Sequence, residues 1–189
     1  PQERAFAVIF NKTPLSGAYV IDLEYRGDER GHFARTFCAE EFAAHDLITR
    51  FVQANTSRAT QAGTIRGLHY QIDPAPEAKL MRCTKGAIFD VIVDMREASA
   101  TWGQWFGVEL TEENRRALYV PEHFAHGFLT LKDDTEVHYM VSAPYTPHTE
   151  RGVRYDDPTV GIRWPITPKV VSDKDRTWPL LSETQAGPG

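Results

Sequence analysis

The sequence predicts an all-β fold, a jelly-roll barrel with short peripheral helices. Short apolar stretches alternate with turn residues along most of the chain. Helical periodicity is confined to a few short segments, and no internal repeat or low-complexity block interrupts the pattern. Short strands at this spacing are typical of a sandwich or barrel, and a jelly roll is the arrangement that we expect.

The expected elements follow one another in a simple order. Strands are expected over Phe6–Phe10, Val20–Leu23, His32–Phe37, Phe51–Asn55, Gly63–Gln71, Lys79–Thr84, Ala87–Met95, Trp105–Leu110, Ala117–Val120, Phe128–Leu131 and Glu136–Val141. Helical segments are expected over Ala39–His45 and Ser172–Trp178. The polar stretch Thr56–Ala62 is predicted to be a loop, Lys85-Gly86 the tight turn of a hairpin, and Ser182–Gly189 a loose tail.

Length and charge limit the class of protein. The 189 residues suit one domain, 1–189, because no change in composition divides them. The net charge of -5 argues against a general binder of nucleic acid or membrane surfaces, although an anionic small ligand responds to local charge. Cys38 and Cys83 form no disulfide framework, and no signal pattern or membrane-spanning stretch is present. We therefore expect a cytoplasmic protein with no nucleic-acid or membrane partner.

The strand Gly63–Gln71 combines glycines with an imidazole. In a regular strand, side chains two positions apart share a face. Alternation predicts one face with Ile65, Gly67, His69 and Gln71 and another with Arg66, Leu68 and Tyr70. The glycines leave room for a ligand or a neighbouring backbone beside His69. A single strand histidine is usually structural, so the rest of the chain must decide whether this is a site.

A metal site is one alternative, because small β-barrels often hold one. Such a site needs a His-x-His pair, a nearby Glu and a later His. Here Gln71 stands two positions after His69, although a later His126 is present. Two imidazoles and an amide make a poor set of ligands, so the predicted pocket holds no metal.

Acid–base chemistry is the alternative to a metal. His69 is a suitable base, because the ordinary histidine pKa of about 6.5 lies near working pH. It requires a carboxylate to orient its other ring nitrogen. Lys79, in phase with Met81, would hold negative charge on an oxygen, and Tyr139 is expected to face the interior as an acid. Together these groups suit proton abstraction next to a carbonyl.

Several motifs then point to a known family. They are Arg66-Gly67-Leu68-His69-Tyr70-Gln71, Lys79-Leu80, Phe89-Asp90-Val91-Ile92-Val93-Asp94, Pro121-x-x-Phe124-Ala125-His126-Gly127-Phe128, Asp156-Asp157-Pro158 and Ser172-Asp173-Lys174-Asp175. On these motifs the chain resembles the dTDP-4-dehydrorhamnose 3,5-epimerase family of metal-free cupins, from about Phe33 to Asp175. The resemblance implies a homodimeric jelly roll that epimerises a dTDP-linked 4-keto-6-deoxyhexose at C3 and C5 without a cofactor.

The resemblance also implies roles for individual residues. His69 matches the family's base, Asp175 its carboxylate partner, Lys79 the lysine near the C4 oxygen and Tyr139 the acid on the opposite face. The implied substrate-binding residues are Arg66, Gln53, Asn55 and His126 around the substrate, Tyr145 as a second aromatic in the sugar pocket, Ser172 and Lys174 near the phosphates, and Arg30 and Phe33 reached from the partner subunit. Arg66 suits a diphosphate because its guanidinium has a fixed fork of donors.

Three positions depart from the family pattern. Met140 replaces a lysine after the tyrosine, Arg35 replaces a glutamate, and His123 replaces a glycine. Other functions therefore stay open: an epimerase that inverts C3 alone, a cupin that binds a nucleotide sugar without catalysis, and a metal-dependent oxygenase. The set His69, Asp175 and Tyr139 argues against the second, and Gln71 argues against the third.

Overall fold

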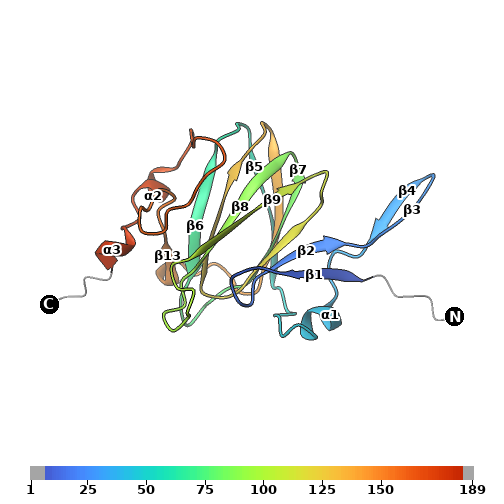
Figure 1. The fold of residues 1–189 in the computed structure, drawn as a ribbon, viewed down its shortest axis with the longest axis horizontal. Helices are drawn as coiled ribbons and strands as arrows, with labels where there is room; N and C mark the ends of the chain where they lie inside the picture. Colours follow the sequence, from blue (N-terminus) through green and yellow to red (C-terminus); the bar gives the residue numbers. More distant parts are fainter. Residues whose placement is uncertain (1–6, 185–189) are drawn as a thin grey trace.

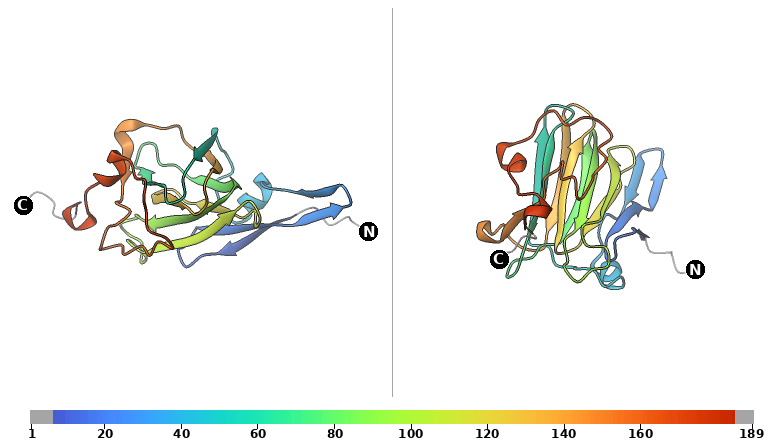
Figure 2. Two further views of the ribbon diagram at one scale, coloured as in Figure 1. Left: turned by 90° about the horizontal axis from the view of Figure 1, so that it is seen from above. Right: turned by 60° about the vertical axis from the view of Figure 1, so that its left-hand side comes forward.

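The computed structural model describes residues 7–184. Two antiparallel sheets face each other as a flattened barrel, which confirms the predicted all-β jelly-roll class (Figures 1 and 2). The six-stranded sheet contains, in spatial order, β1 (Val8–Lys12), β2 (Tyr19–Leu23), β10 (Ala117–Val120), β7 (Lys79–Lys85), β12 (Thr135–Val141) and β5 (Gln53–Ala59). The five-stranded sheet contains β13 (Glu150–Gly152), β6 (Ile65–Gln71), β11 (Phe124–Thr130), β8 (Ala87–Asp94) and β9 (Trp105–Thr111).

The remaining elements are short. A separate hairpin pairs β3 (Tyr25–Asp28) with β4 (Gly31–Ala34). The helical segments are α1 (Ala39–Ala43), the 3-10 turn η1 (Pro147–Thr149), α2 (Asp173–Arg176) and α3 (Leu181–Thr184). Among the residues that the structure describes, no helix is long and apolar enough to cross a membrane.

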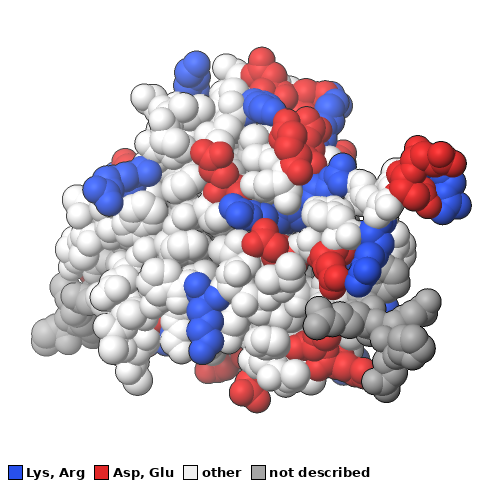
Figure 3. Space-filling model, turned by 45° about the vertical axis from the view of Figure 1, so that its right-hand side comes forward, with Lys and Arg blue, Asp and Glu red and all other residues white. Residues whose placement is uncertain are grey.

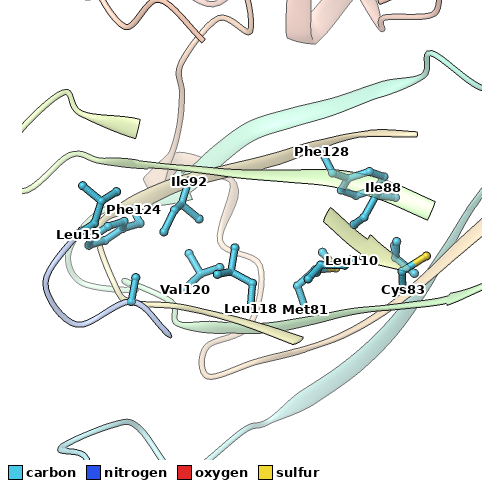
Figure 4. Close-up of a cluster of buried hydrophobic side chains, with 12 residues drawn as sticks. Leu15, Met81, Cys83, Ile88, Ile92, Leu110, Leu118, Val120, Phe124 and Phe128 are labelled. Atoms are coloured by element: carbon cyan, nitrogen blue, oxygen red, sulfur yellow. The ribbon is translucent and has the colours of Figure 1, made fainter. Parts of the chain in front are cut away.

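The main core lies between the two sheets and follows from strand alternation. Met81 and Leu118 point inward from the six-stranded sheet, while Ile88, Ile92 and Phe124 point inward from the other (Figure 4). All five are at most 2 % exposed. Burial of one such side chain contributes roughly 1.5–3 kcal/mol, so this layer holds the sheets together.

The C-terminal segment covers the outer face of the five-stranded sheet. Val91 and Val93 point outward from β8 and pack against Val160 and Leu181. This cover makes both faces of β8 buried. The chain expected to be a loose tail from Ser182 therefore begins with a helical turn, and residues 185–189 lie outside the described part.

Two sequence predictions about local structure are wrong. The Lys85-Gly86 turn does not close a hairpin, because β7 pairs with β10 and β12 whereas β8 pairs with β9 and β11. It carries the chain from one sheet to the other, with Gly86 at a φ of 76°. The stretch Thr56–Ala62 is not all loop, since β5 continues to Ala59 and pairs with β12. Its polar composition reflects an edge strand with one exposed face.

Smaller boundary differences occur in both halves of the chain. The strand expected over Phe128–Leu131 is β11, which begins at Phe124 and ends at Thr130. The expected strand Phe6–Phe10 corresponds to β1, and Phe6 itself lies outside the described residues. The strand expected over His32–Phe37 ends at Ala34, and α1 ends at Ala43 rather than His45.

The β3–β4 hairpin projects from the barrel, at the opposite end of the molecule from α2 and α3 (Figure 1). Its tip carries an ion pair between Arg30 and Asp28, and Phe33 is 57% exposed. On this side of the molecule, acidic and basic side chains lie interspersed rather than in one large patch of a single sign (Figure 3).

Candidate active site

A β-bulge in β6 brings Arg66 and His69 to the same side of the sheet. On β11, Phe128 lies opposite Arg66 and His126 lies opposite His69. Two residues of β6 therefore match the single residue Gly127 of β11, and the alternation of β6 shifts by one position. Both Arg66 and His69 line one cavity. The prediction that they occupy opposite faces is wrong for this reason.

Glycines allow the bulge. Gly67 has a φ of 120°, and a Cβ there would collide with the backbone of Gly127. A side chain at this position is therefore excluded by both conformation and space. Leu68 and Tyr70 pack in the outer cluster beneath the C-terminal segment.

The cavity lies between the sheets and has a volume of about 520 Å³, a size suited to a small-molecule ligand. Its lining residues are Ser57, Thr64, Ile65, Arg66, His69, Lys79, Met81, His126, Phe128, Tyr139, Val170, Val171, Ser172, Lys174 and Asp175. The structure thus brings together all four predicted catalytic residues and four of the predicted substrate-binding residues.

His69 and Asp175 form a close pair. The Nε2 of His69 lies 2.5 Å from Oδ1 of Asp175, and the Gly67 N–H donates to Oδ2 at 3.2 Å. The Ser172 hydroxyl caps α2 by accepting from the Asp175 N–H at 3.1 Å. Burial opposes ionisation of Asp175, but His69, the Gly67 N–H and the Ser172 side chain outweigh it and hold the pKa of the carboxyl below its ordinary value. Because a carboxylate only accepts hydrogen bonds, Nε2 carries the proton and Nδ1 is left as the acceptor.

Lys79 is a buried cation rather than a surface lysine. Its Nζ lies 3.0 Å from Oε1 of Glu77 and 3.4 Å from the carbonyl oxygen of His69. The side chains of Lys79 and Glu77 are 10% and 12% exposed. Glu77 was not predicted, and its position two residues before Lys79, just ahead of β7, gives the only sequence signal.

Tyr139 faces the cavity from β12, in the sheet opposite His69. Burial raises the pKa of its hydroxyl, and Glu77 adds to this effect. The hydroxyl therefore stays protonated at neutral pH and is able to donate. Met140 points away into the cluster around α1, as the alternation of β12 predicts.

A second histidine–carboxylate pair lies in the cavity wall. The Nε2 of His126 is 2.7 Å from Oδ1 of Asp90, and the Asp90 side chain has no exposed surface. Burial raises the pKa of Asp90, while His126 and Lys79 oppose that rise. No role was predicted for Asp90, although an aspartate inside an apolar strand indicates a buried group with a partner.

A polar cluster borders the cavity at α2. Lys174 Nζ lies 2.7 Å from both carboxylate oxygens of Glu150, and the Tyr145 hydroxyl donates to Glu150 at 3.0 Å. Burial lowers the pKa of Lys174, but Glu150 outweighs burial and raises it, so the ammonium stays charged. Tyr145 is 60% exposed and is not among the lining residues. No role was predicted for Glu150.

Four other predicted substrate-binding residues also lie outside the cavity lining. Gln53 and Asn55 share a strand face with Ser57, which does line it. Arg30 and Phe33 lie on the projecting hairpin, where they border a separate shallow pocket. Roles for these four residues remain predictions.

Gln71 does not join the two histidines. Its amide nitrogen donates to the carbonyls of Ala75 and Pro144, and its oxygen accepts from the Thr146 N–H at 2.6 Å. Across residues 7–184, no three His, Cys, Asp or Glu side chains gather as a metal site.

A jelly-roll barrel with a histidine–aspartate pair, a buried lysine and a protonated tyrosine around one cavity defines an acid–base enzyme of the cupin type. The chain belongs to the dTDP-4-dehydrorhamnose 3,5-epimerase family, whose model matches residues 12–183. A dTDP-4-dehydrorhamnose 3,5-epimerase of Sinorhizobium fredii is 48% identical over 158 residues, which cover 83% of this chain and 81% of that protein.

Two solved structures share the fold closely. The dTDP-4-dehydrorhamnose 3,5-epimerase of Bacillus anthracis, with TDP and PPi bound, is 41% identical with a TM-score of 0.88, covering 93% of this chain and 100% of that one. The dTDP-6-deoxy-D-glucose-3,5-epimerase of Legionella pneumophila, in complex with dTDP-4-keto-L-rhamnose, is 38% identical with a TM-score of 0.86, covering 93% and 94%.

Proposed function

We propose that this protein epimerises C3 and C5 of a dTDP-linked 4-keto-6-deoxyhexose, converting dTDP-4-dehydro-6-deoxyglucose to dTDP-4-dehydrorhamnose. The observation that carries the proposal is the 2.5 Å contact between His69 and Asp175, in a cavity that Tyr139 faces from the opposite sheet. A base and an acid on opposite walls suit removal of a proton from one side of a carbon and its return from the other.

The chemistry depends on the C4 ketone, which acidifies the protons on C3 and C5. Nδ1 of His69 removes one of these protons, and Asp175 stabilises the imidazolium that forms. The negative charge then lies on the C4 oxygen as an enolate, which the ammonium of Lys79 stabilises. Tyr139, or a water that it holds, returns a proton from the opposite side, and the centre is inverted. Once His69 has released its proton to solvent and Tyr139 has taken one up, the same steps at the second carbon complete the reaction, with no cofactor required.

The lining of the cavity supplies donors for the diphosphate. Arg66 and Lys174 supply positive charge there, and Ser172 supplies a hydroxyl. Lys174 must exchange its contact with Glu150 for a phosphate oxygen, or share both. His126, held by Asp90, lines the cavity, which supports a role in binding a sugar oxygen. The relatives with bound TDP and dTDP-4-keto-L-rhamnose support a ligand of this class.

A homodimer is part of this proposal. Arg30 and Phe33 lie on the hairpin that projects away from α2, which supports a role in the cavity of a second copy rather than in their own. We also place the protein in the cytoplasm, which suits its two free cysteines, Cys38 and Cys83.

Deuterium incorporation tests the function. Purified protein is incubated with dTDP-4-keto-6-deoxyglucose in heavy water, and the label is located in the sugar. Label at C3 and C5 with inversion of both is expected. Label at C3 alone would make this an enzyme that inverts one centre. Tight binding of the dTDP sugar with no label would favour the binding protein over the enzyme.

A further inference from the structure

Trp178 lies beside the proposed base, yet the reaction above gives it no role. It follows α2 and comes three positions after Asp175. The centroid of its indole is 6.0 Å from that of the His69 imidazole, with an angle of 61° between the rings. This separation falls within the range of direct edge-to-face aromatic contact. Lys174 Nζ lies 5.8 Å from the same indole.

Gly152 provides the space for the indole. It lies on β13 directly opposite His69 on β6. A Cβ at this position would overlap the carbons shared by the two rings of the Trp178 indole. Glycine inside a strand often marks such a close approach. Three parts of the chain therefore meet at this contact: His69 from β6, Gly152 from β13, and Trp178 from the segment after α2.

Packing rather than hydrogen bonding holds Trp178 in place. Its Nε1 is buried and has no hydrogen-bond partner among the described residues. A buried N–H without a partner is unfavourable, so we infer that Trp178 acts through the packing contacts of its ring. Around the ring, the Asp175 side chain is 6% exposed and that of His69 is 31% exposed. Excluding water strengthens an interaction between charged groups.

We propose that Trp178, which packs against Gly152, is a positioning residue. It holds the His69 imidazole against Asp175 and keeps water from their hydrogen bond. Its effect on turnover rests on the proposed function. Its effect on the hydrogen bond can be measured without any substrate.

The kinetic test uses Trp178→Ala, Trp178→Phe, Gly152→Ala and the double variant Gly152→Ala/Trp178→Ala. Trp178→Ala is expected to lower kcat about 10-fold to 100-fold, as a misplaced catalytic group does, with little change in KM. Trp178→Phe keeps a ring and should retain most of the turnover. Gly152→Ala displaces the indole and should lose turnover similarly, and the double variant should be no slower than Trp178→Ala alone, because both changes remove one contact.

The substrate-free test is the proton NMR signal of the imidazole N–H that His69 donates to Asp175. The signal should be visible in the wild type and Trp178→Phe, and lost to exchange with water in Trp178→Ala and Gly152→Ala. Loss of the signal in Asp175→Asn assigns it to the hydrogen bond between His69 and Asp175. The corresponding proton between His126 and Asp90 is the internal control, because those side chains are 5% and 0% exposed. It should stay visible in every variant and so report an intact fold.

Three results would overturn the proposal. One is a Trp178→Ala protein with wild-type kcat and an unchanged signal from His69. Another is a loss of kcat in Trp178→Phe equal to that in Trp178→Ala, which would mean that the indole N–H binds a ligand. The third is a double variant whose loss of kcat equals the product of the two single losses, which would show that the two changes act independently. A wild type that exchanges no deuterium would contradict the proposed function instead, and the NMR comparison would still decide the role of Trp178.

Discussion

His69 and His126 lie directly opposite each other on β6 and β11, but each imidazole is paired with a different carboxylate. The partner of His69 is Asp175 on a C-terminal helix, while the partner of His126 is Asp90 inside the sheet. In the first pair the imidazole is 31% exposed and its carboxylate 6%, so a proton is able to enter and leave at the imidazole. The enclosed pair holds a fixed imidazole in the wall. Two similar pairs are thereby suited to different roles, proton transfer and substrate binding.

Removal of either member of the His69–Asp175 pair should stop turnover without abolishing binding. We expect His69→Ala and Asp175→Asn to lower kcat by about 10²–10⁴-fold, the usual contribution of a general base, while the affinity for dTDP changes little. Steady-state kinetics and calorimetric titration with dTDP measure the two effects. Asp173→Asn, an exposed neighbour on α2, is the matched control. Wild-type turnover in His69→Ala would place the base elsewhere.

Tyr139→Phe should separate proton removal from inversion. The change keeps the ring and its packing but deletes the proposed donor. His69 would still remove a proton and Lys79 would still stabilise the enolate, so deuterium exchange should continue while net epimerisation falls sharply. NMR of the sugar in heavy water measures both. Tyr70→Phe, in the outer cluster, is the control. Equal loss of exchange and inversion would show that Tyr139 positions the sugar and is not the acid.

Activity should survive exhaustive chelation. The reason is Gln71, which stands where a metal site would need a second imidazole. Its amide already forms hydrogen bonds with Ala75, Pro144 and Thr146. Turnover before and after chelation, together with elemental analysis of active protein, provides the test. Stoichiometric zinc or iron whose removal abolishes turnover would contradict this prediction.

Changes on the β3–β4 hairpin should weaken substrate binding. If Arg30 and Phe33 complete a neighbour's cavity, Arg30→Ala and Phe33→Ala should raise KM although His69 and Lys79 are untouched. Glu29→Ala at the same tip is the control. Sedimentation analysis should show a dimer at assay concentration. A fully active monomer would contradict both the dimer and this role of the hairpin.

The stabilising effect of Asp175 should depend on pH. Its pKa is held below the ordinary value of 3.8, so its contribution is fully present above that value and is lost as pH falls through the lowered pKa. The wild type should therefore exceed Asp175→Asn in Tm at pH 7, and the difference should shrink at pH 3 and below. Thermal unfolding monitored by circular dichroism across this range checks the sign. A difference that is constant with pH would show that ionisation of Asp175 is not the cause.

The sequence by itself determined the fold class and the chemical groups. Alternation along strands such as β8 and β12 is local, so it predicts which side chains point inward without knowledge of the neighbouring strand. The family motifs also named His69 and Asp175 together, although 106 residues separate them. The structure brings them to 2.5 Å and places Lys79 and Tyr139 around the same cavity.

Only the tertiary structure decided which strands pair and where alternation fails. The Gly86 turn looks like a hairpin in the sequence, but hydrogen bonding to other strands sends β7 and β8 to opposite sheets. Pairing of β6 with β11 creates the bulge that brings Arg66 to the same cavity as His69. The contacts of Asp90, Glu150 and Trp178 likewise depend on distant segments. These features could not be predicted from local pattern, because hydrogen bonding and close packing between distant parts of the chain determine them.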